Sequence, residues 1–166
     1  MTPDVGGGFS GVEFDGGSTG GQVNNISTEI GILDGTNEVF GVAGVNPDVN
    51  HGDAVTAGTV NYSGSFNLDI GERTDGGFQI DGDSGSITLT ANAFSGTVVG
   101  SGVGTDGTLE INGTFTDTDM GGTATYGGVN ANIAGVIGQD GITAAFAGNT
   151  DDAVLVGGIA LNDDPI

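Results

Sequence analysis

Residues 121–138 read GGTATYGGVNANIAGVIG and combine two features that seldom occur together. Six of the eighteen residues are glycine, yet apolar side chains recur at Ala124, Tyr126, Ile133 and Val136. Glycine weakens an ordinary strand, because it has no side chain to pack and loses much backbone entropy on folding. A strand that must bend sharply benefits from glycine, because no Cβ obstructs the bend. The stretch therefore predicts strands of a closed, sharply curved antiparallel barrel.

Apolar and polar side chains alternate along much of the chain, which is the pattern of strands with one buried face. The inward sets are Val60, Tyr62, Phe66, Leu68 and Ile70 in 58–70, then Ile87, Leu89 and Ala91 in 85–91, then Leu109, Ile111 and Phe115 in 107–116. Further strands are expected near 94–101, 121–127, 129–138, 141–148 and 152–161, each with one apolar and one polar face.

Turn signals rich in Gly and Asp separate these segments. They read TDGG, DGDSG, GTDG, TDTDMGG, GQDG and GNTDD, at residues 74–77, 81–85, 104–107, 116–122, 138–141 and 148–152. Short strands at this spacing indicate an up-and-down barrel or a sandwich, and the glycines within the strands favour the barrel.

The predicted fold class is all-β: a single small antiparallel up-and-down β-barrel of about eight strands with a glycine-rich N-terminal arm. The arm is expected at residues 1–21 and the barrel domain at 22–166. Within the domain we expect a strand near 38–45, then a loop or a single helical turn at 46–54, and little regular helix elsewhere. A glycine-rich arm gains order when it docks on something, and its apolar residues Phe9, Val12 and Phe14 are the candidate partner-binding anchors.

The charge of the chain is strongly one-sided. It has 22 acidic residues against one basic residue, Arg73, and its formal net charge is −21. Such a surface repels phosphate backbones and anionic lipids, so we expect neither a nucleic-acid partner nor membrane-surface binding. No run approaches the roughly 18 apolar residues of a membrane-spanning helix, and the chain as given begins without a signal peptide.

The last third of the chain resembles the β-barrel domain of transferrin-binding protein B and related surface lipoproteins. Tyr126-Gly127 matches an aromatic–Gly step, residues 131–136 match a segment close to AxExxGxF, and residues 144–148 match a strand close to AAFGG. Asn132 replaces the usual acidic residue. The resemblance covers residues 58–161. It implies a barrel whose loops determine which ligand it binds, and the ligands of this family include host proteins and haem proteins.

The sequence offers little catalytic chemistry. Asp83-Ser84-Gly85 spells the tripeptide of aspartic proteases, but it occurs once, and we interpret it as a turn between strands. His51 has no triad partners near it in the sequence. We therefore predict that the chain is not an enzyme, that it has no catalytic residues and that it binds no cofactor. Weak candidates for a surface Ca²⁺ site are Asp117 and Asp119 in one acidic turn and Asp151 and Asp152 in another.

Two hypotheses for function follow. The first is a structural or decorating subunit on the outer surface of a large assembly, a virion capsid or a surface layer, with protein subunits or further copies of itself as partners. The second is a secreted or lipid-anchored surface barrel that recognises a host protein or haem ligand and presents loops such as 46–57 and 71–77. Both place the protein on a virion or on a cell surface.

Overall fold

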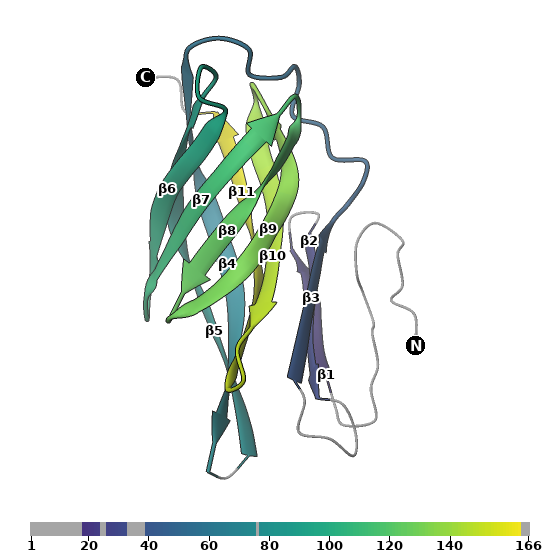
Figure 1. The fold of residues 1–166 in the computed structure, drawn as a ribbon. Helices are drawn as coiled ribbons and strands as arrows, with labels where there is room; N and C mark the ends of the chain where they lie inside the picture. The colour runs from purple at the N-terminus through teal and green to yellow at the C-terminus, as the bar shows by residue number, and fades with distance from the viewer. Residues whose placement is uncertain (1–17, 24–25, 33–38, 76, 164–166) are drawn as a thin grey trace.

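The computed structural model describes residues 18–23, 26–32, 39–75 and 77–163. All regular structure in these ranges is β-strand, as Figure 1 shows. The strands are β1 Ser18–Val23, β2 Ile26–Ile32, β3 Val39–Val45, β4 Thr59–Thr74, β5 Gly77–Asn92, β6 Thr97–Gly104, β7 Thr108–Thr116, β8 Asp119–Tyr126, β9 Val129–Gly138, β10 Gly141–Asn149 and β11 Ala153–Asp163.

Strands β4 to β11 form the predicted closed antiparallel barrel, with neighbours in chain order and β11 paired to β4. Strands β1, β2 and β3 form a separate three-stranded sheet beside it. The closed barrel thus begins at Thr59, and the expected strand near 38–45 belongs to the separate sheet. The arm residues Phe9, Val12 and Phe14 lie outside the described residues.

Glycine allows this barrel to close. A Cβ on Gly135 of β9 would collide with the backbone carbonyl of Thr143 on β10, so the two strands approach more closely there than an alanine permits. Within residues 121–138, Gly127 and Gly128 form the two-residue turn between β8 and β9, with φ angles of 58° and 79°. Positive φ at both turn residues is the geometry that favours glycine in a tight hairpin.

The barrel interior is filled by the apolar faces that the alternation predicts, because each inward set lies on every second residue of its strand. The largest fully buried side chains of this core include Tyr62, Phe66, Phe146, Ile87, Leu89, Leu109, Ile111, Ile137, Ile142, Leu155 and Ile159. The outward residues of β5 and β7 are mainly Ser, Thr, Asn and Glu and are exposed. The prediction of one apolar and one polar face is confirmed for these strands.

For β10 and β11 that prediction is wrong, because both faces of these strands are buried. The outward side chains Val154 and Val156 pack with Ile30 of β2 in a second apolar cluster. Gly41 of β3 lies directly against the same two valines. The three-stranded sheet therefore covers this side of the barrel, and the continuous apolar run of 153–161 is its sequence counterpart.

The segment DGDSG at 81–85 is also not a turn. It lies inside β5, where Asp81 pairs with Ile70 and Gly85 with Phe66 of β4. Strands β4 and β5 each have 16 residues, and β6 pairs with β5 only from Gly85 onward. The β4–β5 hairpin thus extends beyond the barrel rim, at the lower end in Figure 1. The predicted turn at 74–77 is its tip.

Candidate functional site

The strand directions sort the connecting segments to the two ends of the barrel. The β4–β5 connection and the turns at 105–107, 127–128 and 150–152 share the end from which the β4–β5 hairpin extends, which we call the hairpin end. The turns at 93–96, 117–118 and 139–140 share the opposite end, which we call the strap end because the segment 46–58 crosses it on the way to β4. The two loops expected to present a ligand, 46–57 and 71–77, therefore lie at opposite ends and cannot form one site.

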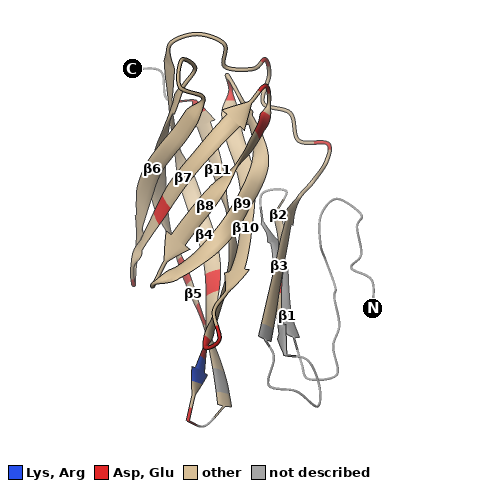
Figure 2. Cartoon of the chain, in the orientation of Figure 1, with Lys and Arg blue, Asp and Glu red and all other residues tan. Residues whose placement is uncertain are grey.

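The Ca²⁺ candidates are divided in the same way. Asp117 and Asp119 lie at the strap end, whereas Asp151 and Asp152 lie at the hairpin end. Figure 2 shows acidic positions at both ends of the molecule. Within the part of the chain that the structure describes, no group of three or more His, Cys, Asp or Glu side chains is placed to hold a metal ion. Each pair remains a prediction.

The carboxylate of Asp83 accepts four hydrogen bonds. It points into the barrel at the hairpin end and is 7% exposed. It accepts hydrogen bonds from the Tyr126 hydroxyl at 2.6 Å, the Thr105 amide at 2.8 Å and the Asp106 amide at 3.3 Å. The amide of Ser84 donates a fourth bond at 2.8 Å.

These bonds explain the protonation behaviour of the pair. The hydrogen bond from Tyr126, with smaller contributions from the backbone amides, lowers the pKa of Asp83. Burial, followed by the hydrogen bond to Asp83, raises the pKa of Tyr126. An aspartic dyad needs two carboxylates that share a proton, whereas this carboxylate is saturated by donors. The geometry gives Asp83 the role of joining β5, β8 and the β6–β7 turn.

The segment 46–58 is bound to the barrel as a strap. The Asp140 amide donates to the His51 carbonyl at 3.0 Å, and the Gln139 amide donates to the Asp53 carbonyl at 2.8 Å. A hydrogen bond of 2.7 Å joins His51 Nε2 to Thr143 Oγ1 of β10, and Val55 is buried. Burial lowers the pKa of His51, and the nearby Asp140 carboxylate partly offsets this shift. His51 therefore binds the strap to β9–β10 of the barrel and is not a free surface histidine.

Tyr62 completes the closure of the strap end. Its hydroxyl is buried and donates to the Gly138 carbonyl at 2.8 Å. Burial, with a smaller contribution from the Asp163 charge, raises the pKa of Tyr62 to about 12. The phenol is thus neutral at physiological pH and serves as a hydrogen-bond donor between β4 and β9.

Two grooves flank the three-stranded sheet where it lies on the barrel. The larger, about 510 Å³, lies between β2 and the outer faces of β11, β4 and β5. Its polar lining includes Asn67, Asp69, Ser84 and Asp106, and burial raises the pKa of Asp69. The smaller groove, about 410 Å³, lies beside β3 and contains Asn130, Asn132 and Asn149. Both grooves can hydrogen-bond polar groups.

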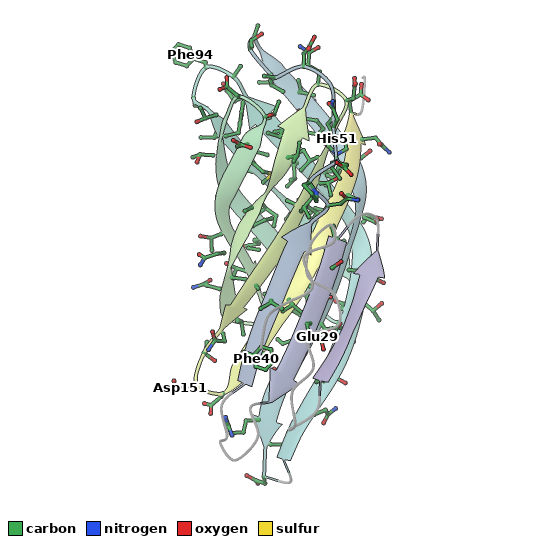
Figure 3. The ribbon with its side chains drawn as sticks, turned by 90° about the vertical axis from the view of Figure 1, so that its right-hand side faces the viewer. Glu29, Phe40, His51, Phe94 and Asp151 are labelled. Carbon is green, nitrogen blue, oxygen red and sulfur yellow. The ribbon has the colours of Figure 1, made fainter. Side chains whose placement is uncertain are left out.

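One exposed residue of the strap end is not marked by any motif in the sequence. Phe94, in the turn between β5 and β6, is fully exposed (Figure 3). The available signal is weak: a single aromatic residue in the segment NAFSG, between a strand end and a glycine. The expected strand near 94–101 would include Phe94, but β6 begins only at Thr97, so that boundary is wrong and Phe94 lies in the turn before the strand.

Arg73, the other residue that is unique in the sequence, lies at the hairpin end. It is near the tip of β4, and its backbone amide donates to the Asp152 carbonyl at 2.8 Å. This bond ties the hairpin to the β10–β11 turn. The single blue position in Figure 2 marks it among the acidic residues.

Comparisons with known proteins reveal similarity of fold. No family model matches the chain, and no curated protein sequence matches it. The haemoglobin receptor HpuA from Kingella denitrificans superposes with a TM-score of 0.53 at 12% identity, over 93% of this chain and 65% of that chain. A transferrin binding protein B (TbpB) mutant from Actinobacillus pleuropneumoniae gives 0.53 at 12% identity, over 84% and 77%. TbpB from Neisseria meningitidis gives 0.50 at 15% identity, over 99% and 37%.

The chain therefore has the TbpB-like barrel fold that its final strands resemble in sequence. It spans only about 65% of the HpuA chain and 37% of the meningococcal TbpB chain. Within the described residues, no helix is long and apolar enough to cross a membrane.

Proposed function

We propose that this chain is a non-catalytic, cell-surface binding module that recognises a protein of a host. The observation that carries the proposal is the fold itself, which the chain shares with HpuA and TbpB over most of its length. The Kingella receptor has been solved in complex with human haemoglobin, and TbpB is named for binding transferrin. This similarity of fold supports the hypothesis of a binding barrel. No finding supports the hypothesis of a decorating subunit on a virion or surface layer.

The site geometry favours a protein partner over free haem. Axial ligands to haem iron are most often His, Met, Cys or Tyr. His51 is the sole histidine, and its Nε2 is engaged with Thr143. The hydroxyls of Tyr62 and Tyr126 are buried and bonded, and Met120 is buried in the core. None of these described side chains is presented on the surface as a ready ligand.

The test is direct binding of the full chain to human haemoglobin and to human transferrin, each immobilised separately, at an ionic strength of about 0.15 M. We expect saturable binding to at least one of them. Hen lysozyme is the control, because a basic protein attracts an acidic one without specific recognition. Binding to both probes that does not exceed the lysozyme signal would count against the proposed function.

A further inference from the structure

The turn at 93–96 presents the most exposed large apolar side chain of the described residues. Phe94 is fully exposed, whereas Tyr62, Phe66, Tyr126 and Phe146 are buried in the core. The exposed Phe94 side chain does not gain the stabilisation that burial of a phenylalanine gives. The side chain projects away from the barrel beyond the ends of β5 and β6 (Figure 3). Its position therefore contributes nothing to the core.

Hydrogen bonds hold the backbone of this turn in one conformation. Asn92 Oδ1 accepts from the amides of Phe94 at 2.9 Å and Ser95 at 3.2 Å, and the Asn92 carbonyl accepts from the Gly96 amide at 2.8 Å. Gly96 takes a positive φ of 67°. A further bond of 2.7 Å joins the hydroxyls of Ser95 and Thr97.

Two more bonds tie the turn to the rest of the barrel. The Ala93 amide donates to the Gly58 carbonyl at 2.9 Å, at the end of the strap, and the Phe115 amide of β7 donates to the Gly96 carbonyl at 2.9 Å. None of these bonds uses the Phe94 side chain. A fixed backbone that presents a free aromatic ring lowers the entropy lost when a partner covers the ring, as in a preorganised anchor.

The neighbouring charges define the partner. The β7–β8 turn at the same end carries Asp117 and Asp119, both exposed, and the β9–β10 turn carries exposed Asp140. Arg73, the sole Lys or Arg of the chain, lies at the opposite end. A second copy of this chain or an anionic lipid surface would bring like charges together. A surface with Lys and Arg around an apolar pocket would complement this end.

We infer that Phe94 is the central anchor of a protein-binding surface at the strap end. It inserts into an apolar pocket of the partner, and Asp117 and Asp119 face basic residues at the margin of that pocket. This inference rests on the proposed function and goes further than it: it names the end of the barrel, the anchoring residue and the chemistry of the partner surface. The grooves beside the three-stranded sheet take no part in it.

The experiment compares Phe94→Ala with Val103→Ala in the full chain. Val103 is 69% exposed on the outer face of β6, away from the turn, and is the matched loss of an exposed apolar side chain. Human haemoglobin and human transferrin are the probes, measured by surface plasmon resonance. We expect Phe94→Ala to weaken binding at least about tenfold, as for an interface hot spot, and Val103→Ala to change it less than about twofold.

A third variant tests the charged margin. Asp117→Asn with Asp119→Asn should slow association and weaken its dependence on salt, with little change in the dissociation rate. Thermal unfolding of each variant verifies that the barrel is intact, which we expect because the bonds of the 93–96 turn use backbone groups and the side chains of Asn92, Ser95 and Thr97.

The outcomes separate the two proposals. If the wild-type chain binds a probe and Phe94→Ala binds equally well, the anchor is wrong and the proposed function stands. If the wild-type chain binds neither probe, the proposed function fails and the inference fails with it. Self-association that Phe94→Ala abolishes would assign the turn to a second copy, and would likewise overturn the inference.

Discussion

At the residue scale, Asp83 connects three parts of the barrel that are distant in sequence. Its carboxylate receives the hydroxyl of Tyr126 from β8, two amides of the β6–β7 turn and the amide of Ser84 next to it. A buried carboxylate is tolerated only when such donors replace the water it has lost. One acidic side chain therefore joins three segments at the hairpin end of the barrel, although the chain as a whole has an excess of acid.

The pH dependence of stability follows from the lowered pKa of Asp83. A carboxyl group whose pKa is lower in the folded state stabilises the fold above its unfolded pKa, near 3.8, and loses this contribution as the pH falls through the folded value. We expect Asp83→Asn to lower the urea midpoint at pH 7. The difference from wild type should shrink between about pH 4 and pH 2, because the wild-type carboxyl is then protonated too.

The measurement is urea unfolding followed by circular dichroism at pH 7 and at about pH 3. Asp151→Asn is the matched control, since it removes the same charge from an exposed turn at the same end. Its midpoint should stay close to that of the wild type. A loss of stability in Asp83→Asn that is equal at both pH values would contradict the assigned role of the carboxylate.

At the element scale, the glycines of the strands are sites of close backbone approach. A Cβ at these positions would meet a backbone carbonyl of the neighbouring strand, as at Gly64 facing Ala160, Gly85 facing Val103, Gly100 facing Thr88 and Gly135 facing Thr143. Their recurrence in several strands gives the sheet the bending that closure of a small barrel demands.

Substitution of one such glycine by alanine should destabilise the fold. Substitution of a glycine whose Cβ position is free of close contacts should not. Gly135→Ala forces Cβ against Thr143 and Ala144, and we expect it to lower the free energy of unfolding by about 1–3 kcal/mol. In Gly121→Ala on β8, the nearest heavy atom, the Ile133 carbonyl oxygen, would lie 3.6 Å from the new Cβ, which is ordinary contact.

Urea unfolding of the two variants gives the comparison. Gly121→Ala should match the wild type or be slightly more stable, because alanine reduces the entropy of the unfolded chain. Equal destabilisation of both variants would mean that loss of glycine is unfavourable in any of these strands, and that close approach is not the reason for it.

At the scale of the whole molecule, the charge of −21 is distributed over a surface with a single arginine. Most described carboxylates are exposed, and they lie both in the connections at the two ends and on the strands (Figure 2). Like charges repel one another in the compact state, and salt screens this repulsion. The buried core and the backbone hydrogen bonds between strands therefore stabilise the fold, whereas repulsion between the carboxylates destabilises it.

Salt should consequently stabilise this protein. Raising NaCl from about 0.1 M to about 1 M shortens the screening length from about 10 Å to about 3 Å. We expect the Tm to rise by at least about 3 °C, which corresponds to about 1 kcal/mol in a domain of this size. A scan at pH 4 serves as the control, because partial protonation of the carboxylates should reduce the effect. A Tm that falls with salt at pH 7 would contradict this account.

The local pattern predicted much of the barrel because alternation is a property of consecutive residues. The inward set of β4 from Val60 to Ile70 follows from the spacing of its apolar residues alone. The same local signals misplaced DGDSG, whose Gly and Asp residues are typical of a turn. Pairing with β4 keeps these residues in a strand, and Gly85 allows the close approach of the Val103 backbone on β6.

Strand alternation, glycine content and one-sided charge can be read from consecutive residues and composition, and they already predict an all-β barrel that is a poor partner for nucleic acid. Which outward face is covered, which turns share an end and which donors surround Asp83 depend on how the strands are assembled in three dimensions. The physical reason is range. Side-chain periodicity acts between neighbours, whereas Asp83 and Tyr126, which are 43 residues apart, are brought together by the closing of the sheet into a barrel. The exposure of Phe94 likewise depends on what the rest of the chain leaves uncovered.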